Sequence, residues 1–347
     1  MTGPADQLLS DLGEIGVVDR ILGRIGMPDG ALVAGGDDAA VVPFGSERLL
    51  LTIDELADEV DFDFAYCSAV DVGWKAIAVN ASDIAAMCGR PLWATVSLAV
   101  PARTAVTMVD EVVEGMLQAA SRWGIGLVGG DLSRAPQVSV TVAMAGRLFG
   151  VDPVLRSGAA VGDALCVTGS LGGAAAGLRL LRAGGGVEDR SSVPHPEGKR
   201  GDAAAELISR QLRPLARVEQ ADALAPLRPS SMIDLSDGLA PDLTRLMKAS
   251  GSGCAVNPDA LPLDHGLEAV LGSDREAAFE VAMVGGEDFE LLFTIDPQSA
   301  AAAIGAVEQT GVSCTQIGRI VEGDCLVGDR PLSSWEEVGW DHLRNQS

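Results

Sequence analysis

Hydrophobic residues recur at helical spacing over residues 71–87, and this stretch predicts a helix with a broad apolar face. Ala76, Ile77 and Ile84 carry the pattern, and so few polar residues interrupt it that we expect most of the helix to be buried. Asp83 lies among these apolar positions, where an ionised carboxylate is costly unless it is paired or binds a metal ion. For one aspartate alone, a narrow solvated stripe or a helix cap is the simpler interpretation.

Strand and helix patterns alternate along the rest of the chain. In the first part, strands are expected at 48–54, 92–100, 125–131 and 138–149, with an amphipathic helix at 104–123. In the second part, strands are expected at 164–169, just before 237, after 288 and at 316–321, with helices between them. The segment from Gly150 to Pro153 is the best boundary, because glycine and proline interrupt both patterns there. The sequence therefore predicts two domains, residues 1–150 and 151–347.

Several aspartates share one context, because each is next to glycine, ends a predicted strand or lies in the apolar helix. They are Asp38, Asp54, Asp83, Asp131, Asp234 and Asp237. Thr52 points to the same strand face as Asp54, since side chains alternate with period two. Clusters of oxygen ligands suit Mg²⁺, which also binds substrate phosphates. Each residue alone is equally well explained as a solvated turn or strand end, and sequence spacing does not show that they converge.

Asp234, Ser236 and Asp237 fall together at a predicted strand-to-helix turn. An ordinary N-cap accounts for one of them. Two acids and a serine at a helix N-terminus suit a bound phosphate with its cation.

Charge limits the possible partners. The chain has 25 Lys and Arg against 49 Asp and Glu, a net charge of -24. This field repels nucleic acid and anionic membranes, so neither is an expected partner. A phosphorylated ligand is repelled as well unless metal ions lie between it and the carboxylates, so phosphate chemistry here is expected to depend on metal.

Cysteine usage and hydropathy indicate the compartment. The six cysteines are scattered without a C-x-x-C pair, which favours buried thiols in a reducing cytoplasm over a zinc site or a disulfide framework. No signal peptide opens the chain and no apolar run approaches the roughly 20 residues that span a bilayer, so we expect a cytoplasmic protein.

Seven motifs, taken in order, resemble those of the thiamine-monophosphate kinase family, within the aminoimidazole ribonucleotide synthetase-like superfamily. They are GDDAAV at 36–41, LTID at 51–54, KAIAVNASDIAAM at 75–87, GGD at 129–131, RSG at 156–158, IDLSDG at 233–238 and GEDFEL at 286–291. The resemblance runs from about Asp11 to His342. It implies an α+β N-terminal domain that dimerises through its sheet, followed by an α/β C-terminal domain. ATP with several Mg²⁺ ions is then expected in the cleft between the two domains.

The resemblance also assigns roles to residues. The implied metal ligands are Asp38, Thr52, Asp54, Asp83, Asp131, Asp234 and Asp237. The implied ATP contacts are Gly130, Asp131, Arg156 and Ser236, and the implied acceptor-side residues are Asp61, Glu287 and Trp340. Asp83, Asp131 and Arg156 are the implied catalytic groups. Without the resemblance, Arg156 would be interpreted as a surface residue after a turn.

The implied reaction is direct transfer of the ATP γ-phosphate to the phosphate of thiamine monophosphate in a homodimeric enzyme. The acceptor phosphate is an anion near neutral pH, so no strong general base is required. The sequence departs from the family at Asp61, where the family has histidine, and at Ile53, where it has a hydroxyl residue. Two alternatives follow: a related kinase with another small acceptor, or a catalytically silent nucleotide-binding homologue.

Overall fold

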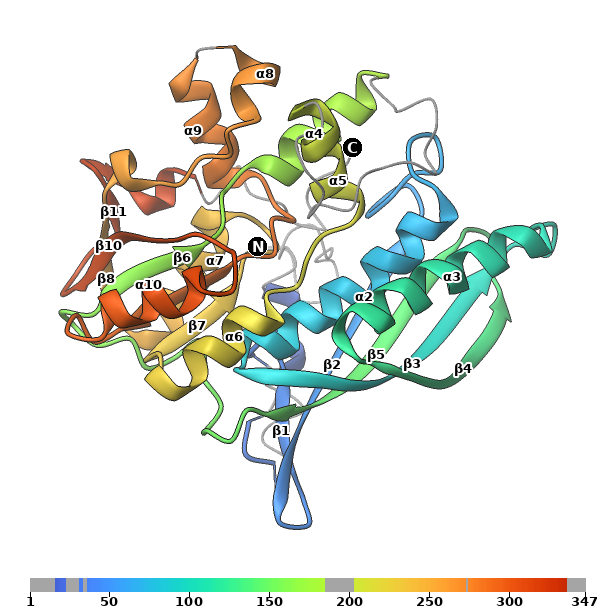
Figure 1. Ribbon diagram of the computed structural model, residues 1–347, viewed down its shortest axis with the longest axis horizontal. Helices are drawn as coiled ribbons and strands as arrows, with labels where there is room; N and C mark the ends of the chain where they lie inside the picture. Colours follow the sequence, from blue (N-terminus) through green and yellow to red (C-terminus); the bar gives the residue numbers. More distant parts are fainter. Residues whose placement is uncertain (1–15, 23–30, 34–35, 185–202, 273, 336–347) are drawn as a thin grey trace, which may run out of the picture.

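The computed structural model describes residues 16–22, 31–33, 36–184, 203–272 and 274–335. Two β-sheets form its framework, one from each half of the chain (Figure 1). Among the described residues, no helix is both long and apolar enough to cross a membrane.

The first sheet has five strands in the order β1-β2-β5-β3-β4. The strands are β1 (Ala40–Phe44), β2 (Glu47–Ala57), β3 (Gly89–Val100), β4 (Gly126–Arg134) and β5 (Ser139–Leu148). Neighbouring strands are antiparallel except β3 and β4, which are parallel and joined through a helix. Along β5, Val140, Val142 and Met144 are buried while their neighbours are partly exposed, so one face of this sheet lies in the core.

Helices α2 (Ala69–Ala86) and α3 (Val106–Trp123) cover that inner face (Figure 1). Ser68 and Asp71 form a capping box at the start of α2, which fixes where the helix begins. The two helices cross at Gly73 and Gly115, where an added Cβ would lie 1.9 Å from a backbone oxygen of the other helix. Any larger residue at either position would push α2 and α3 apart.

The outer face of the sheet carries apolar side chains. The register places Leu51, Ile53 and Trp93 on the face opposite Val142 and Met144. These three side chains are 42%, 64% and 50% exposed. The outer face of this sheet therefore presents a row of exposed apolar side chains.

The second sheet has seven strands in the order β12-β11-β8-β10-β6-β9-β7. Its strands are β6 (Ala164–Thr168), β7 (Ser231–Asp234), β8 (Gly253–Val256), β9 (Leu291–Ile295), β10 (Cys314–Val321), β11 (Leu326–Val327) and β12 (Arg330–Pro331). The helices of this half are α4 (Gly173–Arg182), α5 (Ala203–Leu212), α6 (Val218–Leu224), α7 (Leu239–Ser250), α8 (Leu267–Leu271), α9 (Arg275–Val284) and α10 (Ala300–Glu308). Every residue of β6, β7 and β9 is buried, so the centre of this sheet is covered on both faces.

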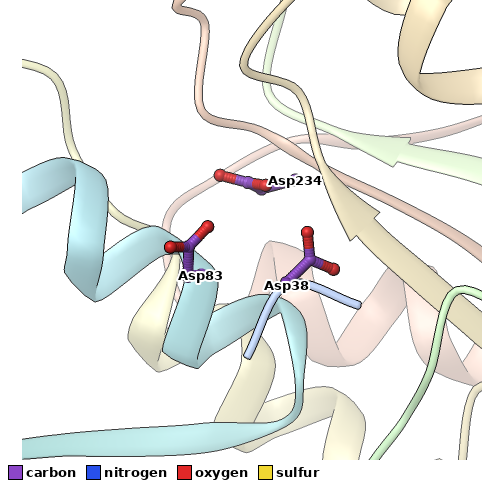
Figure 2. Close-up of side chains that lie close together, drawn as sticks. All are labelled: Asp38, Asp83 and Asp234. Atoms are coloured by element: carbon purple, nitrogen blue, oxygen red, sulfur yellow. The ribbon is translucent and has the colours of Figure 1, made fainter. Parts of the chain in front are cut away.

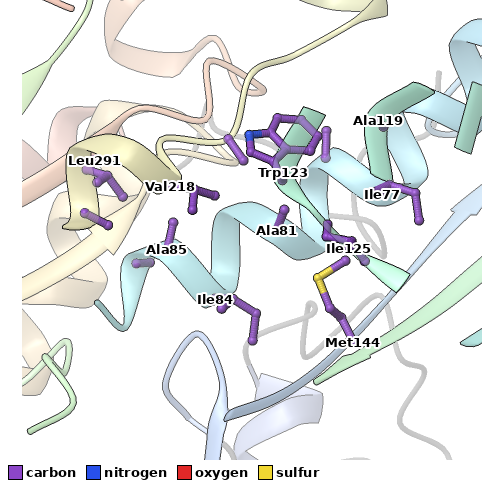
Figure 3. Close-up of a cluster of buried hydrophobic side chains, with 14 of the residues drawn as sticks. Ile77, Ala81, Ile84, Ala85, Ala119, Trp123, Ile125, Met144, Val218 and Leu291 are labelled. Atoms are coloured by element: carbon purple, nitrogen blue, oxygen red, sulfur yellow. The ribbon is translucent and has the colours of Figure 1, made fainter. Parts of the chain in front are cut away.

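Helix α2 lies between the two halves and contacts both. Figure 3 shows Ile84 beside Met144 of the first sheet and Ala85 near Val218 and Leu291 of the second half. All of α2 is buried except Val70 and Asp83, which confirms the burial predicted from its apolar pattern. A helix packed on both sides holds Asp83 at a fixed position between the halves.

Two details differ from the sequence expectation. Asp54 and Asp131 were predicted to end strands, but β2 continues to Ala57 and β4 continues to Arg134. Both strands keep pairing with their neighbours beyond these acids, and a strand with one exposed face accommodates polar residues along its length. The domain division at residues 150–151 stays a prediction, because one core cluster includes residues from both sides of it.

Candidate active site

Three aspartates from distant parts of the chain meet between the two halves. Asp38 precedes β1, Asp83 lies near the end of α2, and Asp234 is the last residue of β7. One carboxylate oxygen from each lies within 4.8 Å of those of the other two, and Figure 2 shows the three side chains pointing toward one another. Like charges this close repel, so the arrangement needs a cation or a proton to offset the repulsion.

A neighbouring side chain donates to each of the three carboxylates. Thr52 Oγ1 donates to Asp83 Oδ2 at 2.5 Å, and Ser82 Oγ donates to Asp234 Oδ2 at 2.6 Å. The guanidinium of Arg156 donates to Asp38 Oδ1 at 2.6 Å. These contacts fix the three carboxylates in position.

Asp38 Oδ2 has a different environment. It is buried and has no hydrogen-bond partner among the described residues. Leaving a buried acceptor unpaired costs about 1–3 kcal/mol, and a coordinated cation removes that cost. A converging set of carboxylate and hydroxyl oxygens without nitrogen or sulfur ligands fits a hard divalent ion such as Mg²⁺.

Burial and repulsion raise the pKa values of these acids. Burial raises the pKa of Asp83 well above its usual value, and the charges of Asp54, Asp234 and Asp38 raise it further. Burial, followed by repulsion from Asp38, likewise raises the pKa of Asp234. The pKa of Asp37 rises to about 6, chiefly through burial. The negative charge of these carboxylates is therefore expected to be neutralised, either by bound protons or by bound metal ions.

The cluster lies at the wall of a cavity of about 820 Å³ formed by both halves of the chain. Ten residues predicted for the site line it: Asp38, Thr52, Asp54, Asp61, Asp83, Arg156, Asp234, Ser236, Asp237 and Glu287. A cavity of this volume accommodates a nucleotide-sized ligand. The structure thus places Thr52, Arg156, Ser236 and every aspartate predicted as a metal ligand except Asp131 around one cavity, although they span some two hundred positions in the sequence.

Asp237 is oriented by residues that the sequence motifs did not include. Arg245 contacts Asp237 at 2.5 Å and Asp242 at 2.7 Å, both through guanidinium nitrogens. Asp242 Oδ2 also accepts hydrogen bonds from the backbone N–H groups of Asp237 and Gly238 at the start of α7. Burial raises the pKa of Asp242 to about 7. Asp242 lies in the first helical turn after the motif at 233–238, and an acid at that position was the sequence signal that could have identified it as a partner of Asp237.

Of the residues predicted for the acceptor side, Asp61 and Glu287 line the cavity, and both contact Lys75. The carboxylate of Asp61 accepts a hydrogen bond from the Ala57 N–H at 2.8 Å, which closes the loop after β2. Lys75 and Gln211 were missed by the sequence reasoning, because their shared partner Glu287 is far away in the chain. Trp340 lies outside the described residues.

Gly130 and Asp131 lie away from the cluster. In the edge strand β4, Asp131 pairs with Ser97 of β3, which in turn pairs with Thr141 of β5 on the outer face of the sheet. Asp131 is exposed there and does not line the cavity. A Cβ on Gly130 would lie 2.0 Å from the carbonyl oxygen of Val96, so strand packing alone requires glycine there. Within one chain, Asp131 does not reach the other acids.

Comparison with known proteins places this geometry in a family. Residues 36–148 match the family model described as AIR synthase related protein, N-terminal domain, and residues 160–328 match the corresponding C-terminal domain. The chain is 33% identical to thiamine-monophosphate kinase of Aquifex aeolicus, covering 96% of this chain and 99% of the relative. It is 36% identical to thiamine-monophosphate kinase of Mycobacterium tuberculosis, covering 92% and 88% respectively.

A solved structure of AaThiL complexed with AMPPCP and TMP is similar over most of its length. It has a TM-score of 0.81 and 31% identity, and the match covers 97% of this chain and 99% of that one. The identity and the coverage agree with the two family models and with the cluster of acids between the two halves. The chain therefore belongs to the thiamine-monophosphate kinase family and has its two-domain, AIR synthase-related architecture.

Proposed function

We propose that the protein transfers the γ-phosphoryl group of ATP to thiamine monophosphate, which yields thiamine diphosphate and ADP. An oxygen of the acceptor phosphate forms the new bond to the γ-phosphorus. The bond from that phosphorus to the β–γ bridging oxygen breaks, and ADP leaves with the electron pair. The observation that carries the proposal is the convergence of Asp38, Asp83 and Asp234 beside Arg156 in a cavity between the two halves.

Mg²⁺ is the proposed cofactor, and the oxygen-only set around the unpaired Asp38 Oδ2 supports it. The proposed ligands are Asp38, Thr52, Asp54, Asp83, Asp234 and Asp237, which all line the cavity. When bound there, Mg²⁺ would neutralise phosphate charge and hold phosphate oxygens beside a strongly acidic protein.

The chain's own residues position the reactants. Arg156 Nη2 lies 2.6 Å from Asp38 Oδ1, and the arginine side chain is 22% exposed at the cavity. A guanidinium held by a carboxylate on one side still has N–H donors for a phosphate on the other. Ser236 lies on the loop before α7, where its hydroxyl is available to a nucleotide phosphate. No residue needs to act as a strong base, because the acceptor phosphate has a second pKa near 6.

We also propose that the protein forms a homodimer through the outer face of the first sheet. Leu51, Ile53 and Trp93 supply the apolar contact. Asp131 is on the same face, and a second copy packed there would bring its Asp131 and Gly130 toward the first copy's site. This arrangement reconciles the predicted roles of Asp131 and Gly130 with their distance from the cluster in one chain.

A cytoplasmic location is proposed as well. None of the six cysteines, all of which are among the described residues, forms a disulfide, and all but Cys325 are buried. Cysteines without disulfides are typical of a reducing compartment.

The direct test is an assay of purified protein with ATP, Mg²⁺ and thiamine monophosphate. Separation of the products is expected to show thiamine diphosphate and ADP in equal amounts, and EDTA is expected to abolish both. Controls omit the acceptor or replace it with free thiamine. ATP consumption only with a different acceptor would indicate the related-kinase alternative. ATP binding without turnover on any acceptor would indicate a silent homologue.

A further inference from the structure

Lys75 is a buried cation whose position the implied chemistry does not explain. It lies in α2 and is 4% exposed. A lysine is retained at such a position only when its charge is paired and its N–H groups are bonded. The ammonium group contacts Oε1 of Glu287 and donates to the carbonyl oxygen of Asp61 at 3.0 Å. Lys75 therefore links α2 to two segments of the cavity wall.

Glu287 is held in place from several directions. Its Oε1 pairs with Lys75, and its Oε2 accepts a hydrogen bond from Nε2 of Gln211 in α5. Its backbone N–H donates to the Ser236 carbonyl at 2.8 Å, and its φ is 71°. A non-glycine residue at positive φ is strained and persists only where its surroundings fix it. The side chain remains 28% exposed, so its carboxylate is oriented and still reaches the cavity.

The same helix carries the metal-site acid. Lys75, Val79 and Asp83 are spaced by four residues and share one face of α2, and Val79 and Asp83 line the cavity. Eight residues of helix separate Lys75 from Asp83 by about 12 Å along the axis. An acceptor with its phosphate at the Asp83 end would extend its organic part toward Glu287. Because α2 is packed on both sides, this separation is fixed.

The chemistry of thiamine monophosphate suits this end of the cavity. Its thiazolium ring has a permanent positive charge, and the amino group on its pyrimidine is the only N–H or O–H donor outside the phosphate. An oriented carboxylate attracts the cation and accepts from the amine. We infer that Lys75 is a positioning residue for the acceptor, acting through Glu287 and the loop at Asp61. The inference rests on the proposed function and adds to it the residue that fixes acceptor recognition.

A double-mutant cycle tests it, with steady-state kinetics for each substrate. Lys75→Met removes the charge and the donors at similar length and is expected to raise the KM for thiamine monophosphate about tenfold, the usual scale for a charged hydrogen bond. The KM for ATP should change less than twofold. Glu287→Gln should give a similar increase, and the double variant should raise the KM by much less than the product of the two single increases. Lys248→Met is the matched control, because Lys248 is 71% exposed and does not line the cavity.

The inference is overturned if the increases in acceptor KM caused by Lys75→Met and Glu287→Gln multiply in the double variant. It is also overturned if Lys75→Met leaves the acceptor KM unchanged, or if Lys75→Met raises the KM for ATP as much as the KM for the acceptor. Should Lys75→Met fail to fold, Lys75→Gln replaces it in the cycle. The glutamine removes the ion pair with Glu287 and retains an N–H donor for the Asp61 carbonyl. The expected rise in acceptor KM is then about fivefold, non-additive with Glu287→Gln. Wild-type protein that does not phosphorylate thiamine monophosphate would instead refute the proposed function.

Discussion

Asp83→Asn should make the metal-free protein more stable while it abolishes catalysis. The amide has nearly the shape of the carboxylate and still bonds the Thr52 hydroxyl, which lies 2.5 Å from Asp83 Oδ2. The substitution removes one negative charge from a set whose oxygens lie within 4.8 Å of one another. It therefore separates the electrostatic role of Asp83 from its packing role.

The magnitude follows from Coulomb's law. Two unit charges 4.8 Å apart repel by about 3.5 kcal/mol at an effective dielectric constant of about 20. Uptake of a proton offsets part of this in the wild type, because burial and the neighbouring acids raise the pKa of Asp83. We therefore expect the variant to gain about 1–2 kcal/mol in EDTA, a rise of a few degrees in Tm. Loss of a preorganised charge at the reacting phosphates should lower kcat by about a hundredfold or more.

The assay compares thermal unfolding of wild type and variant in EDTA and in Mg²⁺, alongside turnover of ATP with thiamine monophosphate. Mg²⁺ should raise the Tm of the wild type strongly and that of the variant weakly. Asp110→Asn, an exposed substitution on α3, serves as the matched control. A variant that loses stability in EDTA, or that keeps wild-type turnover, would show that Asp83 is structural and would refute the electrostatic reasoning.

Three further predictions concern protons, the partner chain and the interface. In EDTA, the free energy of unfolding should fall as pH rises from about 4 to about 7. Asp37, with a pKa of about 6, and Asp242, with a pKa of about 7, keep protons in the folded state that the unfolded chain has released. Urea titrations at several pH values measure this free energy, and an increase of it over that pH range would contradict the prediction. Unfolded Asp83→Asn and Asp131→Asn chains, mixed in equal amounts and refolded together, should regain about a quarter of wild-type activity. Half of the dimers are then mixed, and each mixed dimer has one intact site. If the mixture regains no activity, Asp131 does not contribute to the site of the partner chain. Ile53→Glu should convert the dimer to monomers in sedimentation velocity, because it buries a charge in the outer-face contact, and an unchanged dimer would place the interface elsewhere.

Local pattern was enough to predict much of this protein. The apolar spacing of 71–87 identified α2 and its burial, and the context of Asp83 marked it as unusual. Both features are encoded within a few helical turns, where the helical period sets which residues share a face. The resemblance then assigned the remaining acids to one site, and the structure places most of them around one cavity.

Features that depend on distant pairing were not predictable from the sequence. Strand β2 runs past Asp54 because β5 continues to pair with it, and a strand's length is set by its partner. The face on which Asp131 lies is likewise fixed by register with β3 and β5. The charge of Lys75 is paired by Glu287, which follows it in the chain by more than two hundred residues. Its placement two turns before Asp83 was the one local signal of its role.

The most direct measurement is anomalous diffraction from crystals grown with Mn²⁺ and a non-hydrolysable ATP analogue. Mn²⁺ replaces Mg²⁺ at oxygen sites and gives a signal that locates the ion without reference to the protein coordinates. We predict a peak between Asp38, Asp83 and Asp234, about 2.2 Å from oxygens of at least two of them. Nucleotide bound in the cavity with no anomalous peak at these carboxylates would contradict the account.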